Sequence, residues 1–562
     1  MKPRKYQNKK REKGVESRQL ALRLLIKIEA QNAYSNIVLA GALAKSTLSR
    51  RDRAFVTCLV QGVTRNKNYL DHLISRVYKR PPAKLPPILL NTLRLGIFQL
   101  EFLSNLPSQA VISTSTSIAR NCGHEGLASY TTAVLNKFRK ENNKAPVDTF
   151  ELDELQTLQT AWLVPEKQTE NDSESLNSAA IGSAQTSPNL ANAADAGSIS
   201  KSYADSALIS KSGLLSPLSE EDIEELSLSH SMPEWIVVRW LANYGLSETL
   251  CLLEHSQSPS SIALRVNDTA ITREGLIALF KKEGIKAVPS TLVPSILFVV
   301  ARGKQASGFH TYPGYEEGLF SIQDQAAALV CLALSPKKNE LIVDLCAAPG
   351  GKTLHISEVM ENTGRIIAVD KHESRLDLLK SSQIRLGLTN IEIRATDGLS
   401  FRLDEAEANN LEDRNLVDNR LVDSNLVDSN LVDRVLVDAP CTGTGVLNRR
   451  PDLRYRRRIE DLELLSQLQL GLLNNASRLL KPGGVLVYST CSVEQEENQA
   501  VCDKFLAANK NFRFDDLFPH LSEALSERPE LKEQLEQGWI QILPSMHGLS
   551  GFFIARFVKT ES

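Results

Sequence analysis

Two cysteines stand where a thiol could take part in a reaction. Cys441 follows the apolar run 435–437 in the segment DAPCTGTGV, and Cys491 follows the apolar run 485–488 in YSTCSVEQEEN. Because the two runs should be neighbouring strands of one doubly wound sheet, their ends would place both thiols beside the same pocket. A thiolate that adds to carbon 6 of a pyrimidine makes carbon 5 reactive toward a methyl donor. The pair therefore indicates covalent chemistry on a pyrimidine base.

The other six cysteines lack this context. A lone cysteine most often packs as a small apolar side chain, and we interpret five of them in this way: Cys58, Cys122, Cys251, Cys331 and Cys502. No pair has the spacing of a disulfide framework or of a metal site. The sequence therefore predicts reduced thiols in a cytoplasmic protein that binds no metal.

A second motif, DLCAAPGGKT, runs from Asp344 to Thr353 between an expected strand and an expected helix. Its small residues would let the backbone approach a ligand closely, and the free N–H groups of the helix start favour an anionic group. The next two expected strands end in Asp370, which could accept hydrogen bonds from both ribose hydroxyls, and in Asp397, which could contact an adenine edge. The three strand-end acids predict a crevice that binds a nucleoside.

The same motif leaves an ATPase as an alternative, because its last residues, GGKT, resemble the end of a phosphate-binding loop. However, Cys346 stands where that loop needs its first glycine, and Pro349 lacks the N–H group that would contact a phosphate. Both departures disfavour the ATPase.

From residue 341 onward, strand patterns and helix patterns alternate. The expected strands are LIVDL, GRIIAVD, NIEIRATD, RVLVDAP, GGVLVYSTC and GFFIARFV. This alternation predicts a Rossmann-like α/β domain at 334–562, with a largely parallel sheet between two helical layers. The tripeptide LVD recurs every five residues before Asp438, and we expect a disordered insert without function at about 404–433.

The rest of the chain divides into three further regions. Residues 1–145 show helical periodicity and predict an all-α domain, whose first 140 residues carry 25 Lys and Arg against 7 Asp and Glu. Such an excess of positive charge is typical of a surface that binds nucleic acid. Residues 146–231 are small, polar and acidic and predict a flexible linker, although LSEEDIEELSLSH at its end could form a short helix. Residues 232–333 predict a small α/β domain, and no apolar run is long enough to cross a membrane.

The motifs together resemble those of the RNA 5-methylcytosine methyltransferases, and they occur in the family's order over roughly residues 320–558: DLCAAPGGKT, AVD, ATDG, DAPCTGTGV, YSTCSVEQEEN and GFFIARF. Residues 17–140 resemble the NusB-type RNA-binding domain, and this domain order is similar to that of the RsmB-type members of the family. The resemblance implies transfer of a methyl group from S-adenosyl-L-methionine to carbon 5 of a cytosine in 16S ribosomal RNA. We expect the protein to act as a monomer.

The resemblance also implies roles for individual residues. Cys491 would attack carbon 6 of the base, and Cys441 would assist product release. Asp438 would hydrogen-bond the cytosine edge beside the methyl donor. Lys352 and the loop before it would hold the methionine portion of the cofactor; the loop consists of Cys346, Ala347, Ala348, Pro349, Gly350 and Gly351.

The sequence also contains a basic segment and one departure from the family pattern. Six arginines lie within residues 449–458, directly after the DAPC segment, and predict contact with RNA near the pocket mouth. Ser550 stands where the family pattern has an aspartate before Gly-Phe-Phe.

Two other functions stay open. One is a cytosine-5 methyltransferase for transfer RNA, which the NusB-like domain disfavours. The other is a non-catalytic RNA-binding factor in ribosome assembly, which the intact DAPC and STC segments disfavour.

Overall fold

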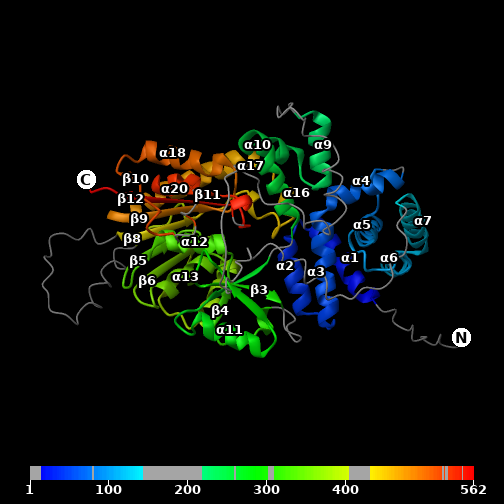
Figure 1. Cartoon of the computed structure of the whole chain (residues 1–562), viewed down its shortest axis with the longest axis horizontal. Coiled ribbons are helices and arrows are strands. Elements are labelled where there is room, and N and C mark those ends of the chain that lie inside the picture. The colour runs from blue at the N-terminus through cyan, green and yellow to red at the C-terminus, as the bar shows by residue number, and fades with distance from the viewer. Residues whose placement is uncertain are drawn as a thin grey trace, which may run out of the picture. The chain divides into compact units, whose positions relative to one another are not determined.

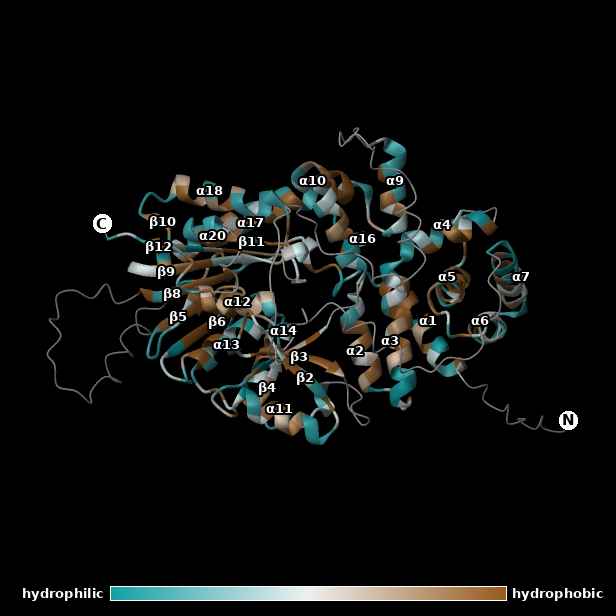
Figure 2. Cartoon of the chain, viewed as in Figure 1, coloured by the Kyte–Doolittle hydropathy of each residue, from teal (hydrophilic) through white to brown (hydrophobic). Residues whose placement is uncertain are grey.

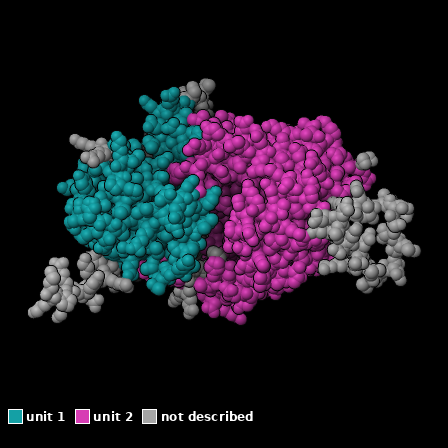
Figure 3. All heavy atoms as spheres, turned by 180° about the vertical axis from the view of Figure 1, so that it is seen from behind, with its two compact units in different colours: residues 1–48, 55–237 teal, residues 49–54, 238–562 magenta. Residues whose placement is uncertain are grey.

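The computed structural model describes residues 14–78, 81–142, 218–258, 261–301, 309–403, 431–521, 525, 529–546 and 548–561. The chain forms two compact units, one of residues 1–48 and 55–237 and the other of residues 49–54 and 238–562, which Figure 3 shows in teal and magenta. Most of the predicted linker and most of the predicted LVD insert lie outside the described residues.

Helices make up the N-terminal part of the chain, as its periodicity predicts (Figure 1). They are α1 (Val15–Ala30), α2 (Ser35–Ala44), α3 (Arg50–Arg65), α4 (Lys67–Val77), α5 (Pro87–Phe102), α6 (Ser108–Cys122) and α7 (Glu125–Glu141). Helix α5 is apolar around most of its circumference, so other helices must surround it, and its residues 89–99 are all buried. A later helix, α9 (Glu220–Ser229), begins at a capping box of Ser219 and Asp222, so the end of the predicted linker is helical.

A buried arginine ties three of these helices together. Arg94 of α5 donates to both carboxylate oxygens of Asp71 in α4, at 2.6 and 2.7 Å, and to Glu29 of α1 at 2.7 Å. Burial raises the pKa of Glu29, but Arg94, Asn91 and Lys67 outweigh it and lower the pKa to about 2. The ionised form of Glu29 therefore contributes to the stability of the helical domain.

A small antiparallel sheet with the strand order β2-β3-β1-β4 follows. Its strands are β1 (Ile262–Val266), β2 (Lys286–Pro289), β3 (Ile296–Ala301) and β4 (Phe320–Ile322), and the same region contains the helices α10 (Glu234–Gln257) and α11 (Arg273–Lys282). Leu264, Leu297 and Phe320 of this sheet pack with Phe280 of α11 in one apolar core.

The larger sheet has the strand order β10-β12-β9-β8-β5-β6-β7, with β11 paired to β12. Its strands are β5 (Leu341–Asp344), β6 (Arg365–Asp370), β7 (Ile391–Ala395), β8 (Val432–Asp438), β9 (Leu480–Thr490), β10 (Phe512–Phe514), β11 (Trp539–Ile542) and β12 (Phe552–Lys559). Strands β5 to β9 pair in parallel, whereas β12 is antiparallel to its neighbours. The predicted α/β domain with a largely parallel sheet is confirmed.

Helices cover both faces of the larger sheet (Figure 1). Because side chains alternate along a strand, Ile342 of β5 packs with α12 (Gln325–Leu334), α13 (Gly351–Val359) and α14 (Glu373–Arg385) on one face. Leu341 and Val343 pack with α17 (Glu460–Leu479) and α18 (Gln499–Ala508) on the other. Figure 2 shows the apolar residues of these elements in brown. The arrangement leaves the carboxyl ends of β5 to β9 along one edge, where ligands bind in such sheets.

Strand β8 begins earlier than predicted. Val432 pairs with Leu480 of β9, and Asp433 accepts a hydrogen bond from Leu341 N at 2.7 Å. The last residues of the predicted insert at 404–433 therefore belong to the strand, since Val432 pairs with β9 and the Asp433 side chain bonds the start of β5.

Within the described ranges, no helix is long and apolar enough to span a bilayer, and no three His, Cys, Asp or Glu side chains gather as metal ligands would.

Candidate active site

Cys441 and Cys491 meet at the carboxyl ends of β8 and β9. The strands are parallel neighbours with Asp438 opposite Ser489, so the turns that follow them lie side by side. The two sulfur atoms are 3.3 Å apart. Cys441 is buried and Cys491 is partly exposed. The prediction that the two strands are neighbours and bring the thiols to one place is confirmed.

The two thiols differ in acidity. The hydrogen bond with Cys441 lowers the pKa of Cys491, against the effect of burial. The positive charges of Arg450 and Lys352 act in the same direction as the hydrogen bond. The hydrogen bond with Cys491 and burial raise the pKa of Cys441 well above its ordinary value, and the negative charge of Glu497 adds to this. The direction of the two pKa shifts favours ionisation of the Cys491 thiol before that of Cys441.

Backbone groups join the two cysteine turns. Gly445 N donates to Cys491 O at 3.0 Å, and Val493 N donates to Thr444 Oγ1 at 3.1 Å. Gly445 O accepts a hydrogen bond from Gly551 N at 2.8 Å, and a Cβ atom on Gly445 would lie 2.1 Å from the Gly551 oxygen. Position 445 needs a glycine because the segment before β12 passes so close to it.

Asp438, the last residue of β8, pairs with a lysine from the first turn of α13. Lys352 Nζ donates to Asp438 Oδ2 at 2.7 Å, and Ser489 Oγ donates to Oδ1 at 2.9 Å. The Lys352 ammonium also lies 5.0 Å from the centre of the Phe552 ring. The structure thus brings Lys352 beside the cysteines, which the sequence did not predict, since the contact depends on β5 and β8 being neighbours.

The loop between β5 and α13 lies at the same edge of the sheet. Ala347 N donates to Val369 O at 2.9 Å and so fastens the loop to β6. Gly350 has a φ of 108°, and a Cβ atom there would lie 2.4 Å from Leu379 Cδ1. A Cβ atom on Gly351 would meet no atom within 4 Å. The start of α13 at Gly351 therefore faces open space, and the N–H group there can approach a ligand.

The three strand-end acids have different surroundings. Asp344 is buried, accepts a hydrogen bond from Thr353 Oγ1 at 2.7 Å, and has its pKa raised by burial to about 7. It holds the loop together, and its place in the crevice stays a prediction. Asp370 accepts a hydrogen bond from Ala348 N at 3.2 Å. Asp397 is exposed at the end of β7.

Most of the arginines at 449–458 bind the protein itself. Four of the six do so: Arg449 pairs with Asp324, Arg454 donates to Ser256 O, Arg456 pairs with Asp452, and Arg457 donates to the carbonyls of Cys441 and Thr442. Only Arg450 and Arg458 of the six are exposed. The prediction of RNA contact is therefore wrong for Arg454, which is fully buried, and stays a prediction for the other five. The segment folds back over the DAPC turn, where carbonyl and carboxylate groups need donors.

Family models match three parts of the chain. Residues 15–140 match the NusB family, residues 232–304 match the ferredoxin-like domain of RsmF/B-like methyltransferases, and residues 331–558 match the family described as 16S rRNA methyltransferase RsmB/F. A probable ribosomal RNA small subunit methyltransferase B of Bacillus subtilis (strain 168) is 30% identical over 96% of this chain and 98% of its own length. The chain belongs to the RsmB/F methyltransferase family.

Two further comparisons of this chain with known proteins agree with this family. A ribosomal RNA small subunit methyltransferase B of Shewanella oneidensis is 32% identical over 61% of this chain and 70% of its own length. The crystal structure of PH0851 matches with a TM-score of 0.65 at 23% identity, over 96% of this chain and 99% of that one, which supports the fold. The predicted family and the predicted NusB-like domain are confirmed.

Ser550 of the RsmB/F protein contacts a helix cap. Its hydroxyl donates to Asp324 Oδ2 at 3.1 Å, and Asp324 caps α12 by accepting from Ala326 N at 2.7 Å. An aspartate at 550 would place a second carboxylate beside Asp324, whereas serine supplies a donor.

Sequence reasoning missed Glu497 and Asn498, which are buried behind the two cysteine turns. They could have been found from the sequence, because they lie six and seven residues after Cys491 and end the motif YSTCSVEQEEN.

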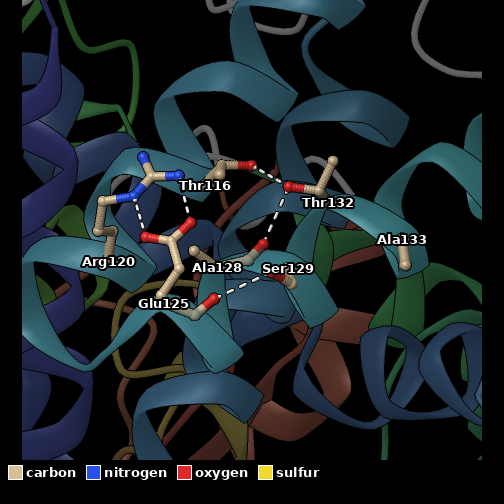
Figure 4. Close-up of a pocket in the computed structure, with 7 residues that line it drawn as sticks. All are labelled: Thr116, Arg120, Glu125, Ala128, Ser129, Thr132 and Ala133. Atoms are coloured by element: carbon tan, nitrogen blue, oxygen red, sulfur yellow. Dashed lines mark hydrogen bonds and ion pairs between the residues drawn. The ribbon is translucent and has the colours of Figure 1, made fainter.

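The helical domain of the RsmB/F protein contains a pocket of about 380 Å³ between α6 and α7 (Figure 4). Its two charged side chains, Arg120 and Glu125, pair with each other at 2.6 Å. The hydroxyl oxygens of Thr116 and Thr132 lie 2.7 Å apart. Because these groups bind one another, the pocket is a weaker candidate site than the cysteine pair.

Proposed function

We propose that this RsmB/F protein methylates carbon 5 of a cytosine in RNA, through a temporary bond between Cys491 and carbon 6 of the base. The thiol pair carries the proposal: the two sulfur atoms lie in hydrogen-bond contact at 3.3 Å, and the pKa of Cys491 is lowered. Transfer of a methyl group to a ribose hydroxyl or a base nitrogen would not need a thiolate. Methylation of carbon 5 does need one, because that carbon is not nucleophilic in the intact aromatic ring.

In the proposed reaction, the Cys491 thiolate adds to carbon 6 and forms a carbon–sulfur bond. The displaced electron pair makes carbon 5 enamine-like, and carbon 5 then takes the methyl group. Loss of the carbon-5 proton to a base returns an electron pair to the ring, breaks the carbon–sulfur bond and restores the thiolate. Cys441 would stabilise the departing sulfur, and Asp438 would hold the cytosine edge.

The loop after β5 fits S-adenosyl-L-methionine, which would supply the methyl group as a sulfonium. Residues 346–351 are small, and Gly351 faces open space. Asp370 ends β6 and Asp397 lies two residues after the end of β7, where they would hold the ribose and the adenine. Lys352 and the loop would hold the methionine portion.

We infer that the substrate is 16S ribosomal RNA, because the relatives from Bacillus subtilis and Shewanella oneidensis are named small subunit methyltransferases. In this proposal the protein is a monomer in which residues 1–145 bind RNA. Residues 146–231 connect this domain to residues 232–333 and 334–562, which form the catalytic part. The thiolate requires a reducing compartment, which supports the predicted cytoplasmic location. Flipping a base out of a stem costs a few kcal/mol, so a loop is the easier target.

Trapping the covalent adduct tests the assignment of the two thiols. Cys491→Ala should abolish methylation and form no protein–RNA adduct, because nothing attacks carbon 6. Cys441→Ala should still form the carbon–sulfur bond but release it slowly, so an adduct that survives denaturing electrophoresis should accumulate. Cys502→Ala is the matched control, since Cys502 is buried in α18 and should leave methylation unchanged.

An adduct in the Cys491→Ala lane that is absent from the Cys441→Ala lane would overturn the assignment. Bisulfite mapping of RNA from cells with and without the gene identifies the substrate. A lost signal in transfer RNA alone would replace 16S ribosomal RNA by the alternative, and no lost signal at all would favour a non-catalytic assembly factor.

A further inference from the structure

The carboxylate of Glu497 lies buried behind the turn that carries Cys441. Glu497 Oε1 accepts hydrogen bonds from Thr442 N at 2.8 Å and from Gln469 Nε2 at 3.1 Å, and Oε2 accepts one from Thr442 Oγ1. Gln469 Nε2 also donates to Pro440 O at 2.9 Å. The residues on both sides of Cys441 are thus fastened to one buried acid and its amide partner.

Arg457 holds the same turn by its carbonyl groups. Its guanidinium donates to Cys441 O at 2.8 Å and to Thr442 O at 3.1 Å. The peptide between Cys441 and Thr442 therefore has its carbonyl group bound by an arginine and its N–H group bound by Glu497. Such a peptide cannot rotate without breaking charge-assisted hydrogen bonds, and the thiol attached to it keeps its direction.

The residue after Glu497 binds the other cysteine turn. Asn498 Oδ1 accepts a hydrogen bond from Thr490 Oγ1 at 2.6 Å, and Asn498 Nδ2 donates to Ser492 O at 3.0 Å. Thr490 and Ser492 flank Cys491. Two consecutive buried residues therefore hold the two cysteine turns in one arrangement, in which the sulfur atoms are 3.3 Å apart.

Charge acts together with this geometry. Glu497 brings a negative charge to Cys441 and contributes to the raised pKa of that thiol, after the hydrogen bond with Cys491 and burial. The groups that act on Cys491 are the Cys441 thiol, Arg450, Asp438 and Lys352. The acid thus stands behind the cysteine that keeps its proton, and the two cations act on the cysteine that loses it.

We propose that Glu497 is a positioning residue that fixes the Cys441 thiol as hydrogen-bond donor to Cys491, and so decides which of the two cysteines attacks the base. The proposal deepens the function proposed above and rests on it for the role of the nucleophile. Glu497 itself contacts neither substrate nor cofactor.

Site-resolved alkylation of the full-length protein tests the proposal. Iodoacetamide reacts with thiolates, and mass spectrometry of the peptides gives the rate at Cys491 and at Cys441 as a function of pH. Glu497→Gln keeps the shape but puts an amide N–H₂ against the donors of Thr442. Alkylation of Cys491 at neutral pH should slow roughly tenfold, the effect of losing one charge-assisted hydrogen bond, while alkylation of Cys441 should become faster.

Glu494→Gln is the matched control. Glu494 lies in the same segment and is equally buried, but it accepts hydrogen bonds from Trp240 Nε1 at 3.0 Å and Arg239 Nε at 2.9 Å instead of from a cysteine turn. Its variant should leave both alkylation profiles unchanged. If Glu497→Gln fails to fold, Glu497→Asp serves instead, since it keeps the charge but is too short to reach Thr442 and Gln469 together. This variant should also slow the alkylation of Cys491.

An unchanged Cys491 profile in the folded Glu497 variant, or an equal change in the Glu494 variant, would overturn the proposal. The experiment needs neither RNA nor cofactor, so its failure is distinct from failure of the proposed reaction. A reversed adduct pattern on the denaturing gel would instead refute the choice of nucleophile while leaving the alkylation result valid.

Discussion

The buried ion pair between Arg265 and Glu358 allows a quantitative test of how the small sheet stabilises the start of α13. Arg265 of β1 donates to the two carboxylate oxygens of Glu358 in α13 at 2.9 and 2.7 Å. It also donates to Gln323 Oε1 and, at 3.0 Å, to Gly351 O in the first turn of α13. Arg265→Met would leave the Glu358 charge buried without its partner, which should destabilise this unit by about 3–5 kcal/mol.

Glu358→Met should cost a similar amount, because it leaves the arginine charge buried. The double variant removes both charges and should lose far less than the sum of the two. A residual loss of about 1–3 kcal/mol remains, since Gln323 and Gly351 keep acceptors without a donor. Amide hydrogen exchange in β1 and α13 measures the opening free energy locally. If the losses of the single variants simply add in the double variant, the pair does not couple and the reasoning is refuted.

Three further predictions concern the cofactor, the RNA and pH. Asp370→Ala should remove a ribose contact worth about 1.5–3 kcal/mol and weaken S-adenosyl-L-methionine roughly ten- to a hundredfold in calorimetric titration; unchanged affinity would contradict the cofactor site. Deleting residues 1–140 should weaken RNA binding and flatten its salt dependence, because fewer counterions are released, and an unchanged salt slope would exclude this domain as the docking surface. Glu29 has a folded pKa of about 2, below its ordinary value of 4.5, so its contribution to stability is present above about pH 4.5 and is lost as pH falls toward 2. The melting temperature of Glu29→Gln should therefore lie below that of the natural protein at pH 6 and approach it near pH 2, and a gap that persists at pH 2 would contradict the assignment.

The sequence predicted the parts of the site that follow from strand order. Each of the cysteine segments ends an apolar run long enough to be recognised as a strand, and alternation with helices implies parallel neighbours. Strands β10 and β11 escaped prediction because residues 512–514 and 539–542 are short. Their conformation depends on pairing with β12, which no local pattern reveals.

Charged residues were harder to place than strands. Lys352 belongs to the cofactor motif in the sequence, but the pairing of β5 with β8 carries it to Asp438. Arg454 and Arg457 look alike in a basic segment, and yet one is fully buried against a carbonyl and the other holds the Cys441 turn. The sequence shows which charged groups need partners, but only the tertiary fold determines which partners they contact.

The acidic residues after Cys491 show the same limit on a smaller scale. Glu494 and Glu497 are both fully buried, whereas the side chain of Glu496 between them is 47% exposed. The segment around residues 495–497 is a 3₁₀ turn, in which residues three apart lie on the same side. No apolar periodicity predicts so short a turn, so the sequence could not separate the buried acids from the exposed one.

The division of labour between the two cysteines is likewise absent from their immediate sequence. Each follows an apolar strand, and either could be a nucleophile by local context alone. What separates them is the charge that the fold brings to each: Arg450 and Lys352 act on Cys491, and Glu497 acts on Cys441. These three residues come from different segments: Lys352 lies in the first turn of α13, Glu497 lies in a 3₁₀ turn after β9, and Arg450 lies in the segment after β8. A change of nucleophile on this fold would therefore require exchanging the surroundings of the two thiols, and moving a cysteine from one strand end to the other would not be enough.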